Sequence, residues 1–431
     1  MKKIKSIASI ILVLVLLLVG CGKKPANQKE STAPTTEPIA VPKVTVTSFE
    51  AGAVFREFHW NGPFVNASTW QRVTDPNVKN EEAHKFLPNP INTINLSGLD
   101  EAVKVEMVIE LWGGHAGTRD KLLRVNDNEW ISVPESEFVG ETESPERYMQ
   151  FRYPAVTIPL AQLKDGDNTF EFSCGEQTVT WGQWGVYGIT FRLYYPVEMR
   201  PQNAQVVLGA SENESLTFSL DSAQDDIAAV EYVGFYEDFD INGDGIYNEW
   251  HYTYRYGEMQ SHIGTSVTAP YSVTWDTTWV PDQEQPMKIM AVVESADGLQ
   301  YITPVLEDIN LNRSAVSVKM YKPYNVPENW MTRDKKTHFC NIMVDDDLSK
   351  AIDSKLIMTT WHGKGCTDIK LNTHNIASNV GLDHNYSYDE LLVTPSQFVD
   401  GRNFLVTYST TLDHGIEVLW PGIVAKIRYN K

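Results

Sequence analysis

From residue 48 to the C-terminus the chain is a succession of short β-type segments. Examples are KVEMVIELW (104–112), TFEFSC (169–174), KIMAVVES (288–295) and FLVTYST (404–410), which are rich in β-branched or aromatic residues. Clusters of Gly, Asn, Asp and Pro separate them, and no long segment has the 3.6-residue period of an amphipathic helix. A chain of 431 residues is also too long for one ordinary domain. We therefore predict an all-β protein made of three consecutive β-sandwich domains.

The N-terminus has the three parts of a secretion signal. The basic stretch MKKIK precedes the apolar stretch IASIILVLVLLL, which is short for a membrane span, and LVGC follows it. LVGC resembles the lipobox of bacterial lipoproteins, in which the cysteine is lipidated, whereas the alternative is an ordinary signal peptide. The resemblance implies a signal peptide at 1–20, a lipid anchor on Cys21 and a place in the bacterial cell envelope outside the cytoplasm. Residues 21–47, rich in Pro, Thr, Ser and Lys, are expected to be a flexible tether.

The two ends of the remaining chain resemble one another. Residues 159–172 read PLAQLKDGDNTFEF and residues 394–408 read TPSQFVDGRNFLVTY, and in both an Asp-Gly-x-Asn turn precedes a strand. These turns resemble the L-x-x-G-x-N turn of jelly-roll, carbohydrate-binding-module-like domains appended to glycan-active enzymes. We therefore expect a sandwich at 48–200 and its diverged repeat at 316–431.

The middle region, 201–315, has a different signature. SVTAPYSVTWDT (266–277), followed by a turn, a strand and an Asp-Gly hairpin, resembles bacterial immunoglobulin-like domains. Compared with that family, the chain carries an insert at residues 237–262.

The insert contains a regular series of oxygen-bearing side chains. Asp238, Asp240, Asn242 and Asp244 occupy every second position, and the backbone carbonyl near Ile246 would complete a shell for a hard cation. A helical calcium-binding hand that started at Asp240 would need Glu at its twelfth position, which is His251. The pattern therefore predicts a structural calcium site in a β-domain. The alternative is a solvated acidic turn.

Charge and motifs limit the functional classes. The formal net charge of −20 argues against nucleic acid as a partner. No metalloprotease, nucleophile-elbow, phosphate-loop or dinucleotide motif occurs. We expect a monomeric lipoprotein that binds a glycan or cell-surface polysaccharide through its terminal sandwiches and is not an enzyme. A glycoside hydrolase or lyase, or a protein-binding adhesin, is the alternative.

The excess of Trp and the C-terminal histidines suggest where a ligand would bind. Sugar sites combine aromatic faces with polar neighbours, and neutral His can both donate and accept hydrogen bonds. The predicted ligand-facing residues are Trp361, His362, His384, His414, Glu417 and Trp420, with Trp181 and Trp184 as a weaker equivalent in the first sandwich. Two or three of these His with Glu417 could equally hold Zn²⁺, or the His could be unrelated surface residues.

The cysteines leave one question open. Cys340 and Cys366 lie in the same predicted domain, and outside the cytoplasm they could form a disulfide or stay as two free thiols.

Overall fold

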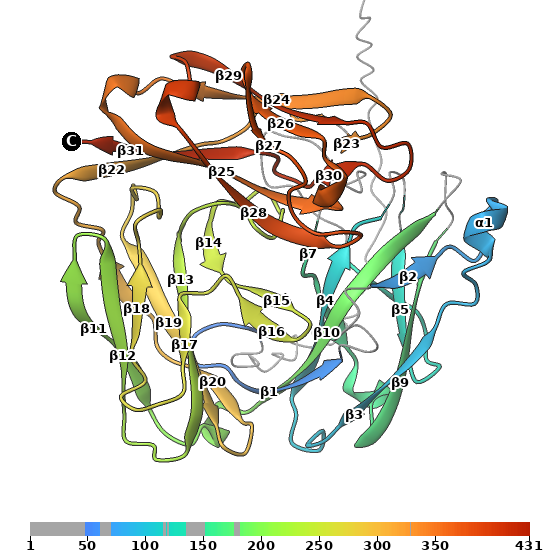
Figure 1. Cartoon of the computed structure of the whole chain (residues 1–431). Coiled ribbons are helices and arrows are strands. Elements are labelled where there is room, and N and C mark those ends of the chain that lie inside the picture. Colours follow the sequence, from blue (N-terminus) through green and yellow to red (C-terminus); the bar gives the residue numbers. More distant parts are fainter. Residues whose placement is uncertain are drawn as a thin grey trace, which may run out of the picture. The chain divides into compact units, whose positions relative to one another are not determined.

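The computed structural model describes residues 48–60, 70–114, 118, 120–134, 151–175, 182–327 and 329–431, which belong to one compact unit, Val44–Lys431. Figure 1 shows that strands dominate these ranges, which confirms the all-β prediction. The described helices are α1 (Glu81–His84) and the 3-10 turns η2 (Leu160–Gln162), η3 (Val197–Met199), η4 (Leu348–Lys350), η5 (Gly363–Gly365) and η6 (Pro395–Gln397). None of them is long and apolar enough to cross a membrane. The predictions for Cys21, the tether and Trp181 fall outside the described residues.

One sheet runs through the first two predicted domains. Its order is β14 (Asn248–His251), β13 (Ile227–Glu237), β19 (Met287–Ser295), β20 (Gln300–Ile302), β1 (Val54–Trp60), β10 (Gln183–Tyr195), β4 (Lys104–Trp112) and β7 (Phe151–Arg152). Side pairings add β17 (Gly264–Ser266), β2 (Gln71–Thr74), β21 (Leu306–Ile309) and β8 (Ala155–Ile158). Val54 of β1 pairs with Tyr195 of β10 on one edge and with Tyr301 of β20 on the other. One continuous hydrogen-bonded sheet thus joins the regions on the two sides of the predicted boundary at residue 200. The domain boundaries stay a prediction.

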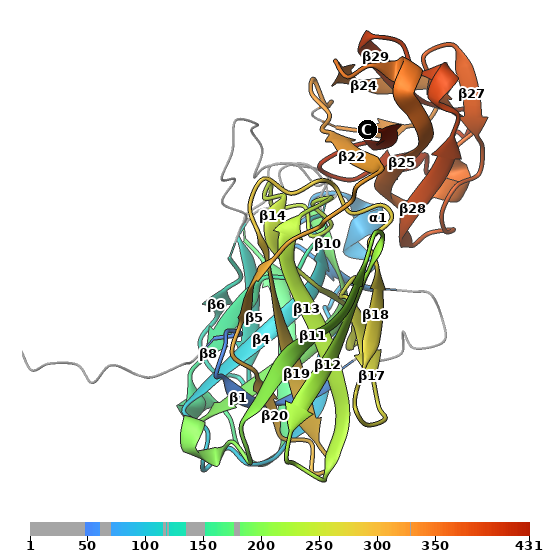
Figure 2. The same ribbon diagram turned by 90° about the vertical axis from the view of Figure 1, so that its left-hand side faces the viewer.

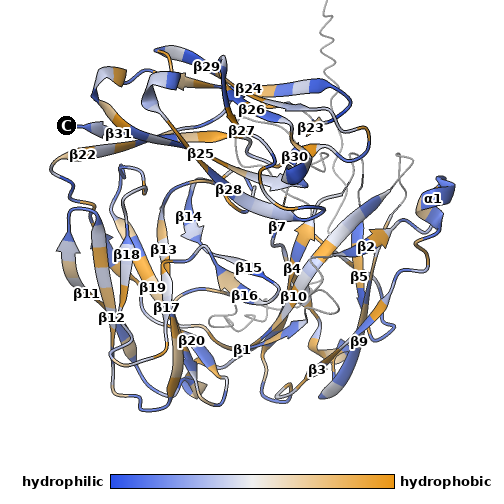
Figure 3. Cartoon of the chain, viewed as in Figure 1, coloured by the Kyte–Doolittle hydropathy of each residue, from blue (hydrophilic) through white to orange (hydrophobic). Residues whose placement is uncertain are grey.

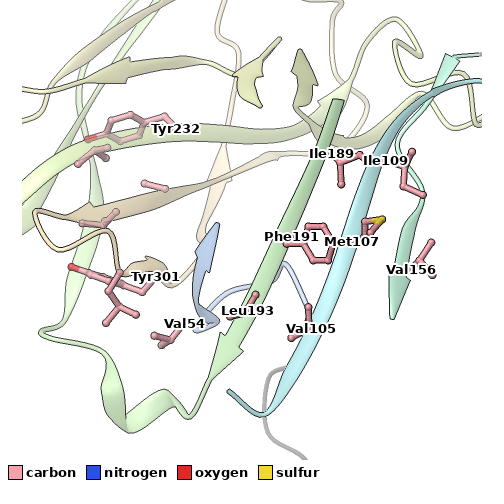
Figure 4. Close-up of a cluster of buried hydrophobic side chains, with 14 of the residues drawn as sticks. Val54, Val105, Met107, Ile109, Val156, Ile189, Phe191, Leu193, Tyr232 and Tyr301 are labelled. Atoms are coloured by element: carbon pink, nitrogen blue, oxygen red, sulfur yellow. The ribbon is translucent and has the colours of Figure 1, made fainter. Parts of the chain in front are cut away.

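A second sheet completes the N-terminal sandwich. Its order is β3 (Ile91–Leu96), β9 (Gly166–Cys174), β5 (Lys121–Val125) and β6 (Ile131–Ser132). Phe170 and Phe172 of β9 are buried, and the residue between them is less so, as expected for a strand with one face on a core. The ring of Phe170 lies 5.8 Å from that of Phe191 on β10, within the core that Figure 4 shows. Figure 3 colours the chain by hydropathy and shows the short helix α1 as hydrophilic.

Residues 201–315 add a three-stranded sheet and a hairpin. The sheet contains β11 (Ala204–Glu212), β12 (Ser215–Ser222) and β18 (Val273–Asp276), and the hairpin contains β15 (Thr253–Arg255) and β16 (Glu258–Gln260). Tyr254 and Met259 of the hairpin pack in one apolar cluster with Phe55 and Tyr194 of the large sheet. At the hairpin turn, the backbone N–H groups of residues 256 and 257 donate to Glu110 at 2.9 and 3.0 Å. The hairpin therefore covers part of the second face of β10, next to Arg192 and Tyr194. Farther along β10, Tyr187 packs on Phe151 and Tyr386 instead.

The C-terminal sandwich has two sheets. One has the order β22 (Val316–Tyr321), β31 (Val424–Asn430), β25 (Ala351–Trp361), β30 (Ile416–Val418) and β23 (Met331–Thr332), with β28 (Tyr386–Val393) also on β25. The other has the order β24 (Lys336–Val344), β29 (Gly401–Ser409), β26 (Asp368–Leu371) and β27 (His374–Ala377). Figure 2 shows this sandwich from another side. Leu356 and Leu405, from the two sheets, belong to one buried core.

Cys340 and Cys366 do not form the disulfide that was one of the two predicted states. The thiol of Cys340 donates to the carbonyl oxygen of Ile423 at 3.8 Å, and that of Cys366 donates to Tyr408 at 3.6 Å. Burial raises the pKa of each thiol to about 12. Each sulfur is therefore a buried thiol with its own backbone partner.

The predicted Asp-Gly-x-Asn turn of the N-terminal sandwich is held by two asparagines. The Asn126 amide donates to the carbonyl oxygen of Gln162 at 2.8 Å and to Oδ1 of Asn168 at 2.7 Å. The Asn168 amide donates to the carbonyls of Lys164 at 2.7 Å and Gly166 at 3.0 Å. Because Asn168 is fully buried, these bonds satisfy polar groups that water does not reach.

The C-terminal sandwich contains the same arrangement. The Asn372 amide donates to the carbonyl oxygen of Gln397 at 2.9 Å and to Oδ1 of Asn403 at 2.8 Å. The Asn403 amide donates to the carbonyls of Val399 at 2.8 Å and Gly401 at 3.0 Å. We call Asn126 with Asn168, and Asn372 with Asn403, the two asparagine pairs.

Candidate functional site

The insert after β13 folds into a tight loop around Asp240. This side chain is fully buried and accepts hydrogen bonds from the backbone N–H groups of Asp244 at 3.1 Å and Gly245 at 2.8 Å. Gly243 and Gly245 have φ values of 69° and 91°, which glycine adopts without a steric penalty. The two glycines thus let the chain fold back over the Asp240 carboxylate.

Three carboxylates meet in this loop. Asp240, Asp244 and Glu249 can each place an oxygen within 4.8 Å of the other two. Burial, followed by the charges of Asp244 and Asp240, raises the pKa of Glu249 to about 9. Burial and the charge of Asp244 raise the pKa of Asp240 to about 7. The group is therefore costly as bare anions and has the oxygen donors that calcium prefers.

The predicted set of calcium ligands needs one correction and one addition. Asp238 lies outside the carboxylate group, contrary to the predicted set, because its carboxylate pairs with the buried ammonium of Lys426. Glu249 was missed, because it stands at the tenth position of a loop begun at Asp240, whereas a helical hand has its Glu at the twelfth. The Asn242 amide donates to Glu249 at 3.1 Å, and the N–H of Ile246 donates to Asp244 at 2.8 Å.

A cleft of about 510 Å³ lies beside this loop. Its aromatic lining consists of Phe49, Tyr153, Phe235, Trp250, Tyr252 and Tyr254. Asn242 and Glu249 of the loop also line it, together with Asn248, Glu106 and Arg192. We call it the aromatic cleft. Because Asn242 and Glu249 belong both to this loop and to the cleft lining, the conformation of the loop sets the shape of one cleft wall.

The predicted C-terminal histidines come together. The ring of His384 lies 4.4 Å from that of His362 and 4.9 Å from that of His414. Asp383, which was not predicted, places Oδ1 2.6 Å from Nδ1 of His384 and 3.1 Å from Nδ1 of His362. We call His362, Asp383, His384 and His414 the histidine cluster. Sequence reasoning could have found Asp383 as the chain neighbour of His384.

Trp361 and Glu417 are buried next to the histidine cluster. Trp361 is 7% exposed, and its indole N–H donates to the hydroxyl of Tyr187 at 3.1 Å. Its ring centroid lies 5.7 Å from that of His362. Glu417 pairs with Trp361 across β30 and β25, and burial raises its pKa to about 8. Neither side chain therefore faces solvent as the predicted ligand-facing set requires.

The two remaining predicted tryptophans differ. Trp184 is fully buried, its indole N–H donates to Ser173 at 3.2 Å, and its ring packs 5.4 Å from Phe172. The prediction that Trp184 faces a ligand is therefore wrong, because the core of the N-terminal sandwich encloses it. Trp420 is half-buried in the segment between β30 and β31.

No protein-family model and no curated protein matches the chain. A β-porphyranase of glycoside hydrolase family 86 from the human gut bacterium Bacteroides plebeius matches at 10% identity and a TM-score of 0.24, over 53% of this chain and 37% of that one. BuGH86 in complex with neoagarooctaose matches at 9% identity and a TM-score of 0.23, over 52% and 34% of the two chains. The Faecalibacterium prausnitzii β-glucuronidase matches at 7% identity and a TM-score of 0.19, over 67% and 52%. The chain thus matches only about a third of the length of the first two enzymes, and at these scores the likeness assigns neither family nor activity.

Proposed function

We propose that the protein is a lipid-anchored glycan-binding protein of the bacterial envelope, and that a neutral oligosaccharide binds in the aromatic cleft. The observation that carries this proposal is the combination of six aromatic rings with Asn, Glu and Arg side chains around about 510 Å³. This volume falls within the range of small-ligand sites. The proposal replaces the predicted ligand-facing residues of the terminal sandwiches with a cleft that is lined both by the N-terminal sandwich, including Glu106 and Arg192, and by the Asp240 loop.

The chemistry of the cleft suits a sugar. Trp250 and Tyr252 are half-buried, so one ring face can meet the C–H groups of a pyranose while the other packs on protein. The side chains of Asn242 and Asn248 can donate to and accept from hydroxyl groups. The net charge of −20 would repel an anionic polysaccharide, which favours a neutral one.

We further propose that calcium holds the loop that forms one wall of the cleft. Asp240, Asn242, Asp244 and Glu249, with a backbone carbonyl near Ile246, would supply the oxygen ligands. The ion would offset the mutual repulsion of the three carboxylates. Its role would be to fix the positions of Asn242 and Glu249 in the cleft, so that chelation weakens glycan binding without any contact between ion and sugar.

Glycan screening of the detergent-solubilised full chain, followed by calorimetry on the best neutral oligosaccharide, tests the site. Trp250→Ala should weaken binding at least tenfold, because it removes a stacking face. Trp130→Ala is the matched control, since Trp130 is 39% exposed and lies outside the cleft. Equal affinities of the Trp250→Ala variant and the wild type would refute the aromatic cleft as the binding site. Release of reducing ends during the assay would instead indicate a hydrolase.

The calcium proposal is tested by thermal melts in calcium and in chelator. At a calcium concentration 100 times the Kd, binding to the folded state alone adds about 2.7 kcal/mol to the free energy of unfolding. Asp244→Asn should abolish this difference, whereas Asp225→Asn, which changes an exposed carboxylate of the same region, should leave it intact. The same melting temperature for the wild type in both buffers would rule out a structural calcium site.

The anchor is tested separately. Replacing Cys21 by Ala should release the protein from the membrane fraction, because lipid on that cysteine is the proposed attachment. Unchanged membrane retention and processing would exclude lipidation at Cys21.

A further inference from the structure

The histidine cluster gathers four metal-binding side chains from three separate segments of the C-terminal sandwich. His362 follows β25, Asp383 and His384 precede β28, and His414 precedes β30. These strands are neighbours, since β25 pairs with both β28 and β30. The loops that carry the four residues therefore meet at one end of one sheet.

The distances suit a single small cation. Oδ1 of Asp383 lies 3.1 Å from Nδ1 of His362 and 2.6 Å from Nδ1 of His384, and the three ligand atoms lie within 4.8 Å of one another. Ligands bound to one tetrahedral ion at about 2.1 Å are roughly 3.4 Å apart. Small adjustments of the exposed Asp383 and His384 would therefore bring all three atoms onto one ion. The ring of His414, 4.9 Å from that of His384, is close enough to supply a fourth ligand.

His362 is held in a defined orientation at the cluster. The backbone N–H of His384 donates to Nδ1 of His362 at 3.1 Å, and an ion bound at Nδ1 would take the place of this N–H donor. A Cβ at Gly365 would lie 2.7 Å from Cδ2 of His362, so glycine is the residue that leaves room for the ring. The close backbone limits the ways in which the imidazole can turn.

All three histidines adopt an uncommon backbone conformation. The φ values are 51° for His362, 47° for His384 and 45° for His414, in the left-handed region that is unfavourable for most side chains. Residues in this region concentrate at functional sites, where the surrounding structure keeps them in place. Three such residues with converging rings, on three different loops, support a shared ligand rather than three unrelated turns.

We propose that His362, Asp383, His384 and His414 bind a divalent zinc-class metal ion. Two or three imidazoles with one carboxylate suit Zn²⁺ and similar first-row ions, whereas calcium prefers the oxygen-only group of the Asp240 loop. Asp383, His384 and His414 reach the surface, so the ion would be accessible to solvent. The two proposed sites differ in donor atoms and can be loaded independently.

The test is calorimetry and equilibrium dialysis of Zn²⁺ with the full chain in calcium-containing buffer. We expect one tightly bound Zn²⁺ per chain and, with Co²⁺ as a substitute, visible absorption bands of a low-coordinate site. His384→Ala should weaken zinc binding at least 100-fold, and His414→Ala at least tenfold. The matched control is His374→Ala, because His374 is an exposed histidine of the same sandwich outside the cluster.

Specific results would overturn the proposal. Absence of zinc binding by the wild type would refute the site, as would wild-type affinity in the His384→Ala variant. Wild-type affinity in His414→Ala would remove His414 from the ligand set, and a loss of affinity in His374→Ala would show that binding is not confined to the cluster. Because His384 and His414 are at the surface, both variants should fold, which thermal melts in the absence of metal verify.

Discussion

The N-terminal and C-terminal sandwiches are held by the same polar turn and differ at one loop end. In each, an asparagine with positive φ, Asn126 at 49° or Asn372 at 55°, bonds a second, fully buried asparagine. Beyond this shared turn, the segment after Trp112 begins with Gly113, whereas the segment after Trp361 begins with His362. The comparison teaches that one β-framework tolerates different chemistry at its loop ends, because the asparagine pair rather than the loops secures the turn.

The strand that enters from this loop end also differs. Thr190 pairs with Val108 and Val424 pairs with Ile357, and these partners stand four residues before Trp112 and Trp361 (112 − 108 = 4, 361 − 357 = 4). Val424 therefore matches Thr190. Trp184 lies six residues before Thr190, whereas Trp420 lies only four residues before Val424 (190 − 184 = 6, 424 − 420 = 4). The two tryptophans are therefore not equivalent.

The C-terminal sandwich lacks a continuous strand at the place of β10, and the cause is local. There β10 has no continuous counterpart, and β30 and β31 are separate strands. Pro421 follows Trp420, and proline cannot donate a ladder hydrogen bond. Pro421 thus separates Trp420 from β31, the strand that takes the place of β10 in the C-terminal sandwich.

The largest expected effect concerns the asparagine pairs. Asn168→Ala and Asn403→Ala should each lower the free energy of unfolding by about 3 kcal/mol, because each removes several buried hydrogen bonds and leaves backbone groups unsatisfied. Urea denaturation checks this, with exposed Asn375→Ala as the control. A loss in only one of the two sandwiches would show that the pairs do not have the same role.

A pH-dependent effect on stability is expected at the buried acids, and it differs between the two sandwiches. The pKa of Glu417 is raised to about 8 from 4.5, so the folded state binds a proton that the unfolded state has lost, and stability falls as pH rises from about 4.5 to 8. Glu417→Gln removes this loss, and relative to wild type it should gain on the order of 3 kcal/mol between pH 5 and pH 8. Thermal melts at both pH values measure the difference, and a difference that stays constant with pH would contradict it.

Glu110 should respond in the opposite sense. Its two carboxylate oxygens accept the backbone N–H groups of Tyr256 and Gly257, and its pKa is raised to about 7, mainly by burial. In Glu110→Gln an amide NH₂ would face one of these donors. At pH 8 this variant should therefore be about 1–2 kcal/mol less stable than wild type. Stabilisation by both substitutions would show that the hairpin bonds contribute little.

The smallest effect on stability is expected at the histidine cluster. His414→Gly relieves the cost of a φ of 45°, but it also increases the entropy of the unfolded chain. The two terms offset one another, so the free energy of unfolding without metal should change by less than about 1 kcal/mol. Zinc affinity should nevertheless fall at least tenfold. A large loss of stability in metal-free protein would mean that His414 is a structural residue.

The local sequence was sufficient to predict the features that depend only on neighbouring residues. Alternation of apolar and polar side chains predicted strands such as β9, and the Asp-Gly-x-Asn turns predicted where Asn168 and Asn403 are placed. The alternating acids placed Asp240 and Asp244 in one loop. These predictions succeed because strand period and turn geometry are set within a few residues of the chain.

The burial of particular side chains and the contacts between distant residues could be seen only in the folded structure. From the sequence, both Trp184 and Trp361 were candidates for exposed side chains that stack on a ligand. In the structure, both are buried in the cores of their sandwiches. Glu249 reaches Asp240 because β14 pairs with β13 and returns the chain to the loop. The aromatic cleft joins Phe49 to Trp250, which no local pattern connects. Burial and long-range contacts follow from how the sheets pack, and that depends on the whole chain at once.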